Sequence, residues 1–171
     1  MLDALRKRRD EEGFTLIELM VVVLIIGILV AIAVPTFLKA QENAKSKAAA
    51  SNLRSALSSA KTMHAEEETY LDGTLATTIS TLKEYEPSLK WQTAASTQPE
   101  QISYFSNAST IAGFANRSKN QYCFYIVDNV ASSGGGTTYG KSDATAASCA
   151  ATVDTTAAGI TWADSTKGAG W

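Results

Sequence analysis

The sequence predicts an α+β protein in which one long N-terminal helix packs on a small antiparallel β-sheet. An unbroken apolar run over residues 19–34 passes into a helical repeat that continues to about residue 71. Strand-like runs begin only after residue 101, and the strongest of them is Tyr122–Val127. A continuous apolar and aromatic run of this kind suits a central strand that packs on a helix.

The apolar half of the predicted helix covers residues 14–38. It is long enough to span a membrane, because about 20 helical residues cross the bilayer core. Four basic residues at positions 6–9 precede it, and the positive-inside rule then predicts a cytoplasmic N-terminus. Glu18 is the one carboxylate in this segment. Because a carboxylate at the centre of a membrane helix costs roughly 3 kcal/mol, we expect Glu18 to have a function.

The amphipathic half of the same helix is predicted over residues 39–72. If residues 14–71 form one helix, it has 58 residues and is about 87 Å long. Pro35 removes one helical hydrogen bond, so we expect a kink or local melting there, and Gly27 could have the same effect. Asp72-Gly73 is the predicted stop signal. Apolar residues recur at three- and four-residue steps: Leu53, Ala56, Leu57, Ala60, Met63, His64, Tyr70 and Leu71.

The predicted globular head covers residues 73–171. Residues 74–101 are interpreted as an irregular connection with one short helix or turn near residues 82–85, stopped by Pro87. Strands are predicted at residues 102–105, 111–115 and 122–127, with weaker candidates at 152–153 and 160–162. Of residues 131–171, 30 of 41 are Ala, Ser, Thr or Gly. Threonines together with Trp162 and Trp171 favour surface loops and edge strands over a floppy tail.

Composition excludes several classes of function. The chain has 15 basic and 17 acidic residues, a net charge of −2. Removing residues 1–13 takes away four of each and leaves 11 and 13, so there is no strong attraction for nucleic acid or anionic lipid. Two cysteines and the lone His64 fall short of a four-ligand metal site. No catalytic constellation is recognisable, so we expect neither an enzyme nor a cofactor.

Cys123 and Cys149 are the only cysteines. In one exported domain, a single cysteine pair predicts one disulfide. It would close a loop of about 27 residues and stabilise the fold by roughly 3.5 kcal/mol in the chain-entropy model. The alternative is two unpaired buried thiols.

Residues 135–142, Gly-Gly-Thr-Thr-Tyr-Gly-Lys-Ser, match the G-x-x-x-x-G-K-[ST] pattern of phosphate-binding P-loops. Such a loop works only between a buried strand and a helix N-terminus. Residues 128–134 separate the match from the nearest predicted strand, and too few apolar residues follow it to make a packed helix. We therefore expect a turn-rich loop that matches by chance.

Two sequons, at Asn107 and Asn116, fit the N-glycosylation pattern, but such short patterns are common by chance.

The segment Gly13-Phe14-Thr15-Leu16-Ile17-Glu18-Leu19-Met20, together with its charged leader, resembles the type III signal of type IV pilins and related pseudopilins. The resemblance is close from residue 13 to about residue 41. It implies that a prepilin peptidase removes residues 1–13 by cutting between Gly13 and Phe14, and that Phe14 is then N-methylated. It also places helix-softening residues at Gly27 and Pro35, and implies a disulfide-bounded C-terminal loop like that of many type IV pilins.

The resemblance further implies a mechanism of assembly. The precursor is a single-pass protein of the inner membrane, and the mature chain forms an extracellular helical filament of identical copies. The apolar helices exchange lipid for one another in the filament core, and Glu18 pairs with the amine of Phe14 of an adjacent copy or its own. Gly27 and Pro35 let the helix loosen and stretch. A peptidase, an assembly ATPase and a platform protein are the implied partners. Adhesion, twitching motility, DNA uptake and electron transfer are not distinguished.

Several alternatives stay open at this point. Residues 31–33, Ala-Ile-Ala, fit the cleavage site of an ordinary secretory signal, which would be removed whole, and a plain single-pass anchor is a further reading. Within the resemblance, the leading hypothesis is a major pilin, and the second is a pseudopilin of a secretion or DNA-uptake machine. The cysteine pair leans toward a pilin, because secretion pseudopilins typically lack the disulfide and carry a calcium loop. A membrane-anchored binding or enzymatic domain is the third hypothesis.

Overall fold

The computed structural model describes residues 13–131 and 135–164. The chain divides into two compact units, one up to Gln41 and the other from Glu42 onward. Helix α2 (Leu16–Glu67) runs through both, and the second unit adds helix α3 (Leu75–Tyr85) and a six-stranded sheet. The predicted α+β class, with a long N-terminal helix and a sheet, is confirmed. Residues 1–12, which are most of the expected leader, and Trp171 lie outside the described residues.

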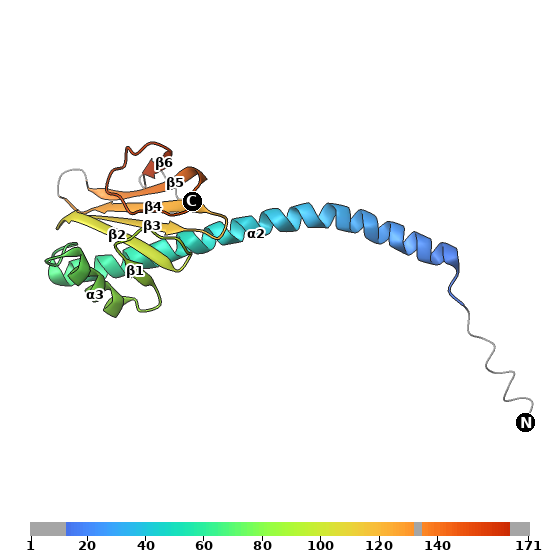
Figure 1. Ribbon diagram of the computed structural model, residues 1–171, viewed down its shortest axis with the longest axis horizontal. Coiled ribbons are helices and arrows are strands. Elements are labelled where there is room, and N and C mark those ends of the chain that lie inside the picture. The colour runs from blue at the N-terminus through green and yellow to red at the C-terminus, as the bar shows by residue number, and fades with distance from the viewer. Residues whose placement is uncertain (1–12, 132–134, 165–171) are drawn as a thin grey trace, which may run out of the picture. The chain divides into compact units, whose positions relative to one another are not determined.

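The sheet has the strand order β1-β2-β3-β4-β5-β6, so β4 is an interior strand as predicted. Its strands are β1 (Lys90–Gln92), β2 (Gln101–Ala108), β3 (Ile111–Arg117), β4 (Tyr122–Asn129), β5 (Gly136–Thr145) and β6 (Ile160–Asp164). Figure 1 shows these strands side by side over the second half of α2. The sheet is antiparallel as expected except at one edge, where β1 pairs in parallel with β2.

The second half of α2 forms one side of the main hydrophobic core. Its buried residues recur at helical spacing and include five that the sequence pattern predicted. They pack against alternate residues of β2, β3 and β4, of which Tyr104, Phe114 and Ile126 are fully buried. The helical residues of this core are Ala49, Leu53, Ala56, Leu57, Ala60 and Met63.

Helix α2 ends earlier than the sequence pattern predicted. It stops at Glu67 because Glu68 adopts a left-handed backbone conformation (φ 54°). The chain then turns toward the sheet, where the Tyr70 N–H donates to the Ser109 carbonyl at 2.7 Å. Gly73 also has a positive φ, of 67°, but it lies in the connection before α3 and does not cap α2.

The opposite face of the sheet is covered by the segment between β5 and β6. Cys149 in this segment forms the predicted disulfide with Cys123 of β4, and both residues are fully buried. Ala115, Tyr125 and Trp162 surround the disulfide in a second, smaller hydrophobic cluster. The expected strand at residues 152–153 is absent, and backbone atoms of Thr152 lie so close to Gly113 that a Cβ there would clash, at 2.1 Å from the Thr152 carbonyl oxygen.

The P-loop-like residues adopt a structure that differs from the predicted turn-rich loop. Residues 136–145 form β5, in the middle of which Gly140 pairs with Trp162 of β6. A Cβ at Gly140 would lie 2.8 Å from the indole ring, so this glycine makes room for an aromatic side chain. A phosphate-binding loop between a strand and a helix is not formed by these residues.

Candidate functional site: an apolar helix surface with one carboxylate

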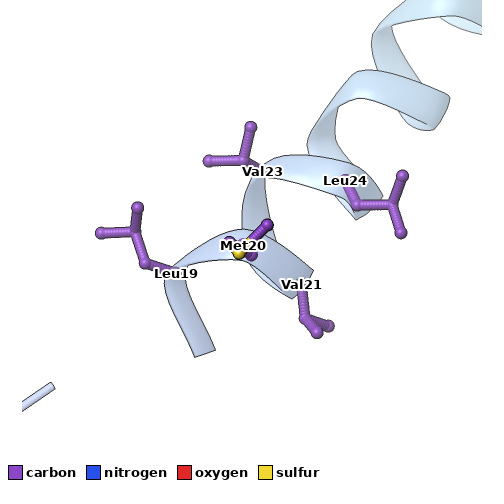
Figure 2. Close-up of a pocket in the computed structure, with 5 residues that line it drawn as sticks. All are labelled: Leu19, Met20, Val21, Val23 and Leu24. Atoms are coloured by element: carbon purple, nitrogen blue, oxygen red, sulfur yellow. The ribbon is translucent and has the colours of Figure 1, made fainter. Parts of the chain in front are cut away.

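The first half of α2 presents apolar side chains on all sides. Within residues 14–38, eighteen large apolar side chains are exposed, each by at least 46%. Figure 2 shows five of them around an open groove on this helix, Leu19, Met20, Val21, Val23 and Leu24. Among the described residues, α2 is the one helix that is long and apolar enough to cross a membrane. Such a surface requires lipid or other apolar chains around it.

Glu18 lies at the first turn of this helix and is held there by Thr15. The Glu18 carboxylate accepts hydrogen bonds from the Thr15 N–H at 2.9 Å and from the Thr15 hydroxyl at 2.6 Å. In return, the Glu18 N–H donates to the Thr15 hydroxyl oxygen at 3.3 Å. This reciprocal arrangement is a capping box, which satisfies N–H groups that the helix start would otherwise leave unpaired. Its sequence signal is the T-x-x-E spacing before an apolar run, a capping pattern that was not recognised from the sequence.

A second open groove lies beside the same carboxylate. It is lined by Phe14, Ile17, Glu18, Val21 and Val22. Gly13 and Phe14 precede α2 in irregular backbone and are exposed, with 74% of Phe14 accessible. No atom lies within 4 Å of the position that a Cβ on Gly13 would occupy. The structure therefore presents the Gly13–Phe14 peptide bond in open, non-helical backbone, beside the carboxylate.

Gly27 and Pro35 both lie inside α2, which continues through them without interruption. The expected local melting at Pro35 is therefore not found. The proline removes the N–H that would bond to the Ala31 carbonyl. One residue further on, the Thr36 hydroxyl donates to the Ala33 carbonyl at 2.9 Å and lies 3.4 Å from that of Ile32. Hydroxyls of this kind supply hydrogen bonds to carbonyls in a proline-containing membrane helix.

The second unit contains a buried polar network that the sequence did not predict. Asp128 of β4 is 1% exposed and accepts hydrogen bonds from Tyr70 at 2.6 Å and from Thr137. The Lys61 ammonium lies 3.1 Å from the same carboxylate. Burial raises the pKa of the Tyr70 hydroxyl, and the hydrogen bond to Asp128 raises it further. The network links α2, the connection after it and strands β4 and β5, and so fixes the helix to the sheet.

The residues that the structure describes show no candidate metal centre. No group of three or more His, Cys, Asp or Glu side chains that could hold an ion is found there. The His64 ring packs on Tyr70, with ring centroids 4.5 Å apart.

Of the sequon asparagines, Asn107 is exposed, whereas Asn116 is fully buried and donates to the carbonyls of Pro99 and Gln101.

Comparisons with known proteins point to the same helix. A family model described as the prokaryotic N-terminal methylation motif matches residues 8–34. The chain carries a type IV prepilin motif. The matched residues include Gly13, Phe14 and Glu18, as the sequence resemblance implied.

Two curated relatives match this prepilin-like chain, a type IV major pilin and a core protein of a type II secretion system. The type IV major pilin protein PilA of Myxococcus xanthus is 50% identical over 60 residues, which are 35% of this chain and 27% of the relative. The type II secretion system core protein G of Pseudomonas aeruginosa is 54% identical over 39 residues, 23% of this chain and 28% of the relative. The matches thus span little more than a quarter of each relative. No solved structure matches the chain.

Proposed function

We propose that this protein is the structural subunit of a type IV pilus, a major pilin. The observation that carries the proposal is the continuous apolar surface of α2 with Glu18 at its start. The prepilin motif and this apolar helix fit a membrane-anchored precursor that becomes part of an extracellular filament. The similarity to a type IV major pilin supports a structural role for this chain.

The energetics of the apolar surface explain why assembly needs other copies of the chain. At about 1.5–3 kcal/mol for each large apolar side chain, exposing all eighteen to water would cost on the order of 30–50 kcal/mol. Lipid covers this surface before assembly, and transfer from lipid to protein gains little, since lipid tails are as apolar as leucine. A subunit that leaves the membrane must therefore enter a bundle of equivalent helices directly. If the copies in such a bundle contact one another head to tail and the contacts do not close into a ring, the bundle grows into a helical fibre.

Glu18 supplies the specificity that apolar packing lacks. In the single chain its carboxylate is bound to Thr15, one residue from Phe14. Cleavage between Gly13 and Phe14 would create a positively charged amine beside this carboxylate or beside that of an adjacent copy. A charge pair in a low-dielectric core depends strongly on distance, so it would fix the axial register of neighbouring helices.

The experiment compares Glu18→Leu with Ile17→Leu, an apolar change at the neighbouring position. We expect Glu18→Leu protein to be processed and to accumulate in the membrane fraction, while the yield of sheared fibres falls at least tenfold. Glu18→Asp should be partly tolerated at best, because the carboxylate is one methylene shorter. Ile17→Leu should assemble normally. Normal fibres from Glu18→Leu would remove the carboxylate from the mechanism.

The second candidate function is that of a pseudopilin in a secretion or DNA-uptake machine. The similarity to the type II secretion core protein favours it. The disulfide between Cys123 and Cys149 favours the pilin, by the family pattern described above. Electron microscopy with an antibody against the head separates the two. Long surface fibres labelled along their length are expected of a major pilin, and their absence in secreting cells would favour the pseudopilin.

A further inference from the structure

The second unit has opposite charges at its two ends. One end, here the basic end, contains residues 42–47 of α2 and residues 117–120, which are the last residue of β3 and the turn after it. The Asn120 side chain joins these segments by donating to the Ser46 hydroxyl at 3.0 Å. Together they carry four basic residues and one acidic residue, a net charge of +3. The basic residues are Lys45, Lys47, Arg117 and Lys119.

The other end, here the acidic end, contains residues 66–72 and the last turn of α3, residues 83–86. Tyr85 joins these segments by donating a hydrogen bond to Glu66 at 2.5 Å. That bond, with Glu67 and Glu84 nearby, raises the pKa of Tyr85 to about 12. The two segments carry six acidic residues and one basic residue, a net charge of −5.

The acidic end breaks a local rule of helix stability. Glu66 and Glu67 occupy the last turn of α2, where the helix dipole favours cations. Glu68 follows in a left-handed conformation that glycine or asparagine usually occupies. Glu67 and Glu68 are exposed, so the isolated chain leaves this negative charge facing solvent. A cation from outside the chain would relieve the repulsion.

We propose that the basic end of one copy of this chain contacts the acidic end of the next copy, so that successive copies associate head to tail. The two ends cannot meet within one chain, because Lys47 and Glu67 are 20 helical residues apart, about 30 Å along α2. Opposite charges at opposite ends make a contact that repeats without closing, and such contacts generate filaments. The inference rests on the proposed function and adds to it a second interface, separate from the apolar helix.

Zero-length carbodiimide crosslinking of the full-length chain, in sheared fibres and in membranes, tests this contact. A carbodiimide joins an amine to a carboxylate only where the two touch, so a Lys47–Glu67 or Lys119–Glu84 product identified by mass spectrometry must link two copies. We expect such products. Fibres that form without them would overturn this inference and leave the proposed function standing. Products in membranes of cells that make no fibres would support the contact and count against the pilus. The absence of both fibres and products would reject both proposals.

Charge reversal gives an independent test. Lys47→Glu with Lys119→Glu, and separately Glu67→Lys with Glu84→Lys, should each lower fibre yield at least tenfold, and the quadruple variant should recover most of it. Lys90→Glu and Glu100→Lys are the matched controls, since Lys90 and Glu100 are exposed and lie outside both ends. Equal losses in the quadruple variant would refute complementarity. If only the lysine reversals lower fibre yield and the glutamate reversals do not, the basic end does not contact the acidic end of the next copy, and this inference is overturned.

Discussion

The disulfide offers the sharpest test of how the head is stabilised. Cys123 and Cys149 are 26 residues apart and fully buried. Their bond holds the segment that covers one face of the sheet, and Ser96 pairs with Cys149 through two backbone hydrogen bonds of 2.7 and 2.8 Å. Replacing both cysteines by serine removes this cross-link and leaves small side chains of similar size. We expect the fold to survive with a large loss of stability.

The size of the loss follows from the closed loop. In the chain-entropy model, a loop of about 27 residues contributes roughly 3.5 kcal/mol to the free energy of unfolding. Burying two hydroxyls where a disulfide stood adds to the cost unless each finds a partner. For a domain of this size, 1 kcal/mol shifts the melting temperature by about 3–5 °C, so we expect a fall of roughly 10–15 °C or more.

Tryptophan fluorescence of the detergent-solubilised full-length chain measures this change. The three tryptophans, at positions 91, 162 and 171, all lie in the head sequence, so the signal reports the head and not the apolar helix. The double Cys→Ser variant should melt lower than the oxidised wild type, and reduced wild type should melt close to the variant. Equal melting temperatures for all three samples would refute the reasoning. Membrane insertion should be unchanged, because α2 up to residue 41 contains neither cysteine.

Two further changes probe the packing of the head, each checked by the same melting assay. Lys61→Met leaves the buried Asp128 carboxylate without its cation and should lower the free energy of unfolding by about 2 kcal/mol. This is less than for a fully buried pair, because half of Lys61 is exposed. Lys47→Met on the same helix is the control, and equal effects of the two changes would show that Asp128 does not need the cation. Gly113→Ala should lower the free energy of unfolding by about 1–3 kcal/mol, because the added methyl pushes Thr152 away from the sheet. Gly136→Ala should leave stability unchanged, because no atom lies near the added methyl. If Gly113→Ala also leaves stability unchanged, Thr152 does not approach Gly113 closely.

Much of the helix and the central strand could be predicted from sequence, because burial sets a clear period there. Leu53, Leu57 and Met63 follow the helical spacing and are buried in the same core as residues of β4, whose own apolar run was recognised. The end of the helix was misplaced because Gly73 gave the strong local signal, whereas Glu68, which has little intrinsic preference for a left-handed φ, adopts it in the folded chain.

Strand β5 was missed for a related reason. Its residues, rich in Gly, Thr and Ser, carry little apolar periodicity, and their strand conformation comes from pairing with β4 on one side and β6 on the other. The P-loop pattern suggested that Gly140 could serve phosphate binding. In the structure, a side chain at Gly140 would clash with the ring of Trp162, which is distant in sequence, so the glycine makes room for this ring. The Asp128 network was equally hidden, since its partners Lys61 and Thr137 come from separate elements.

The proposed assembly requires that the chain keep its apolar helix after processing and assemble through it. N-terminal mass spectrometry of the protein sheared from the cell surface tests this directly. We expect a mature chain that begins at Phe14 and carries one extra methyl group on its amine. A surface protein that begins at Val34, after the Ala31-Ile32-Ala33 site, would have lost Glu18 and the apolar segment, and could not assemble in the proposed way.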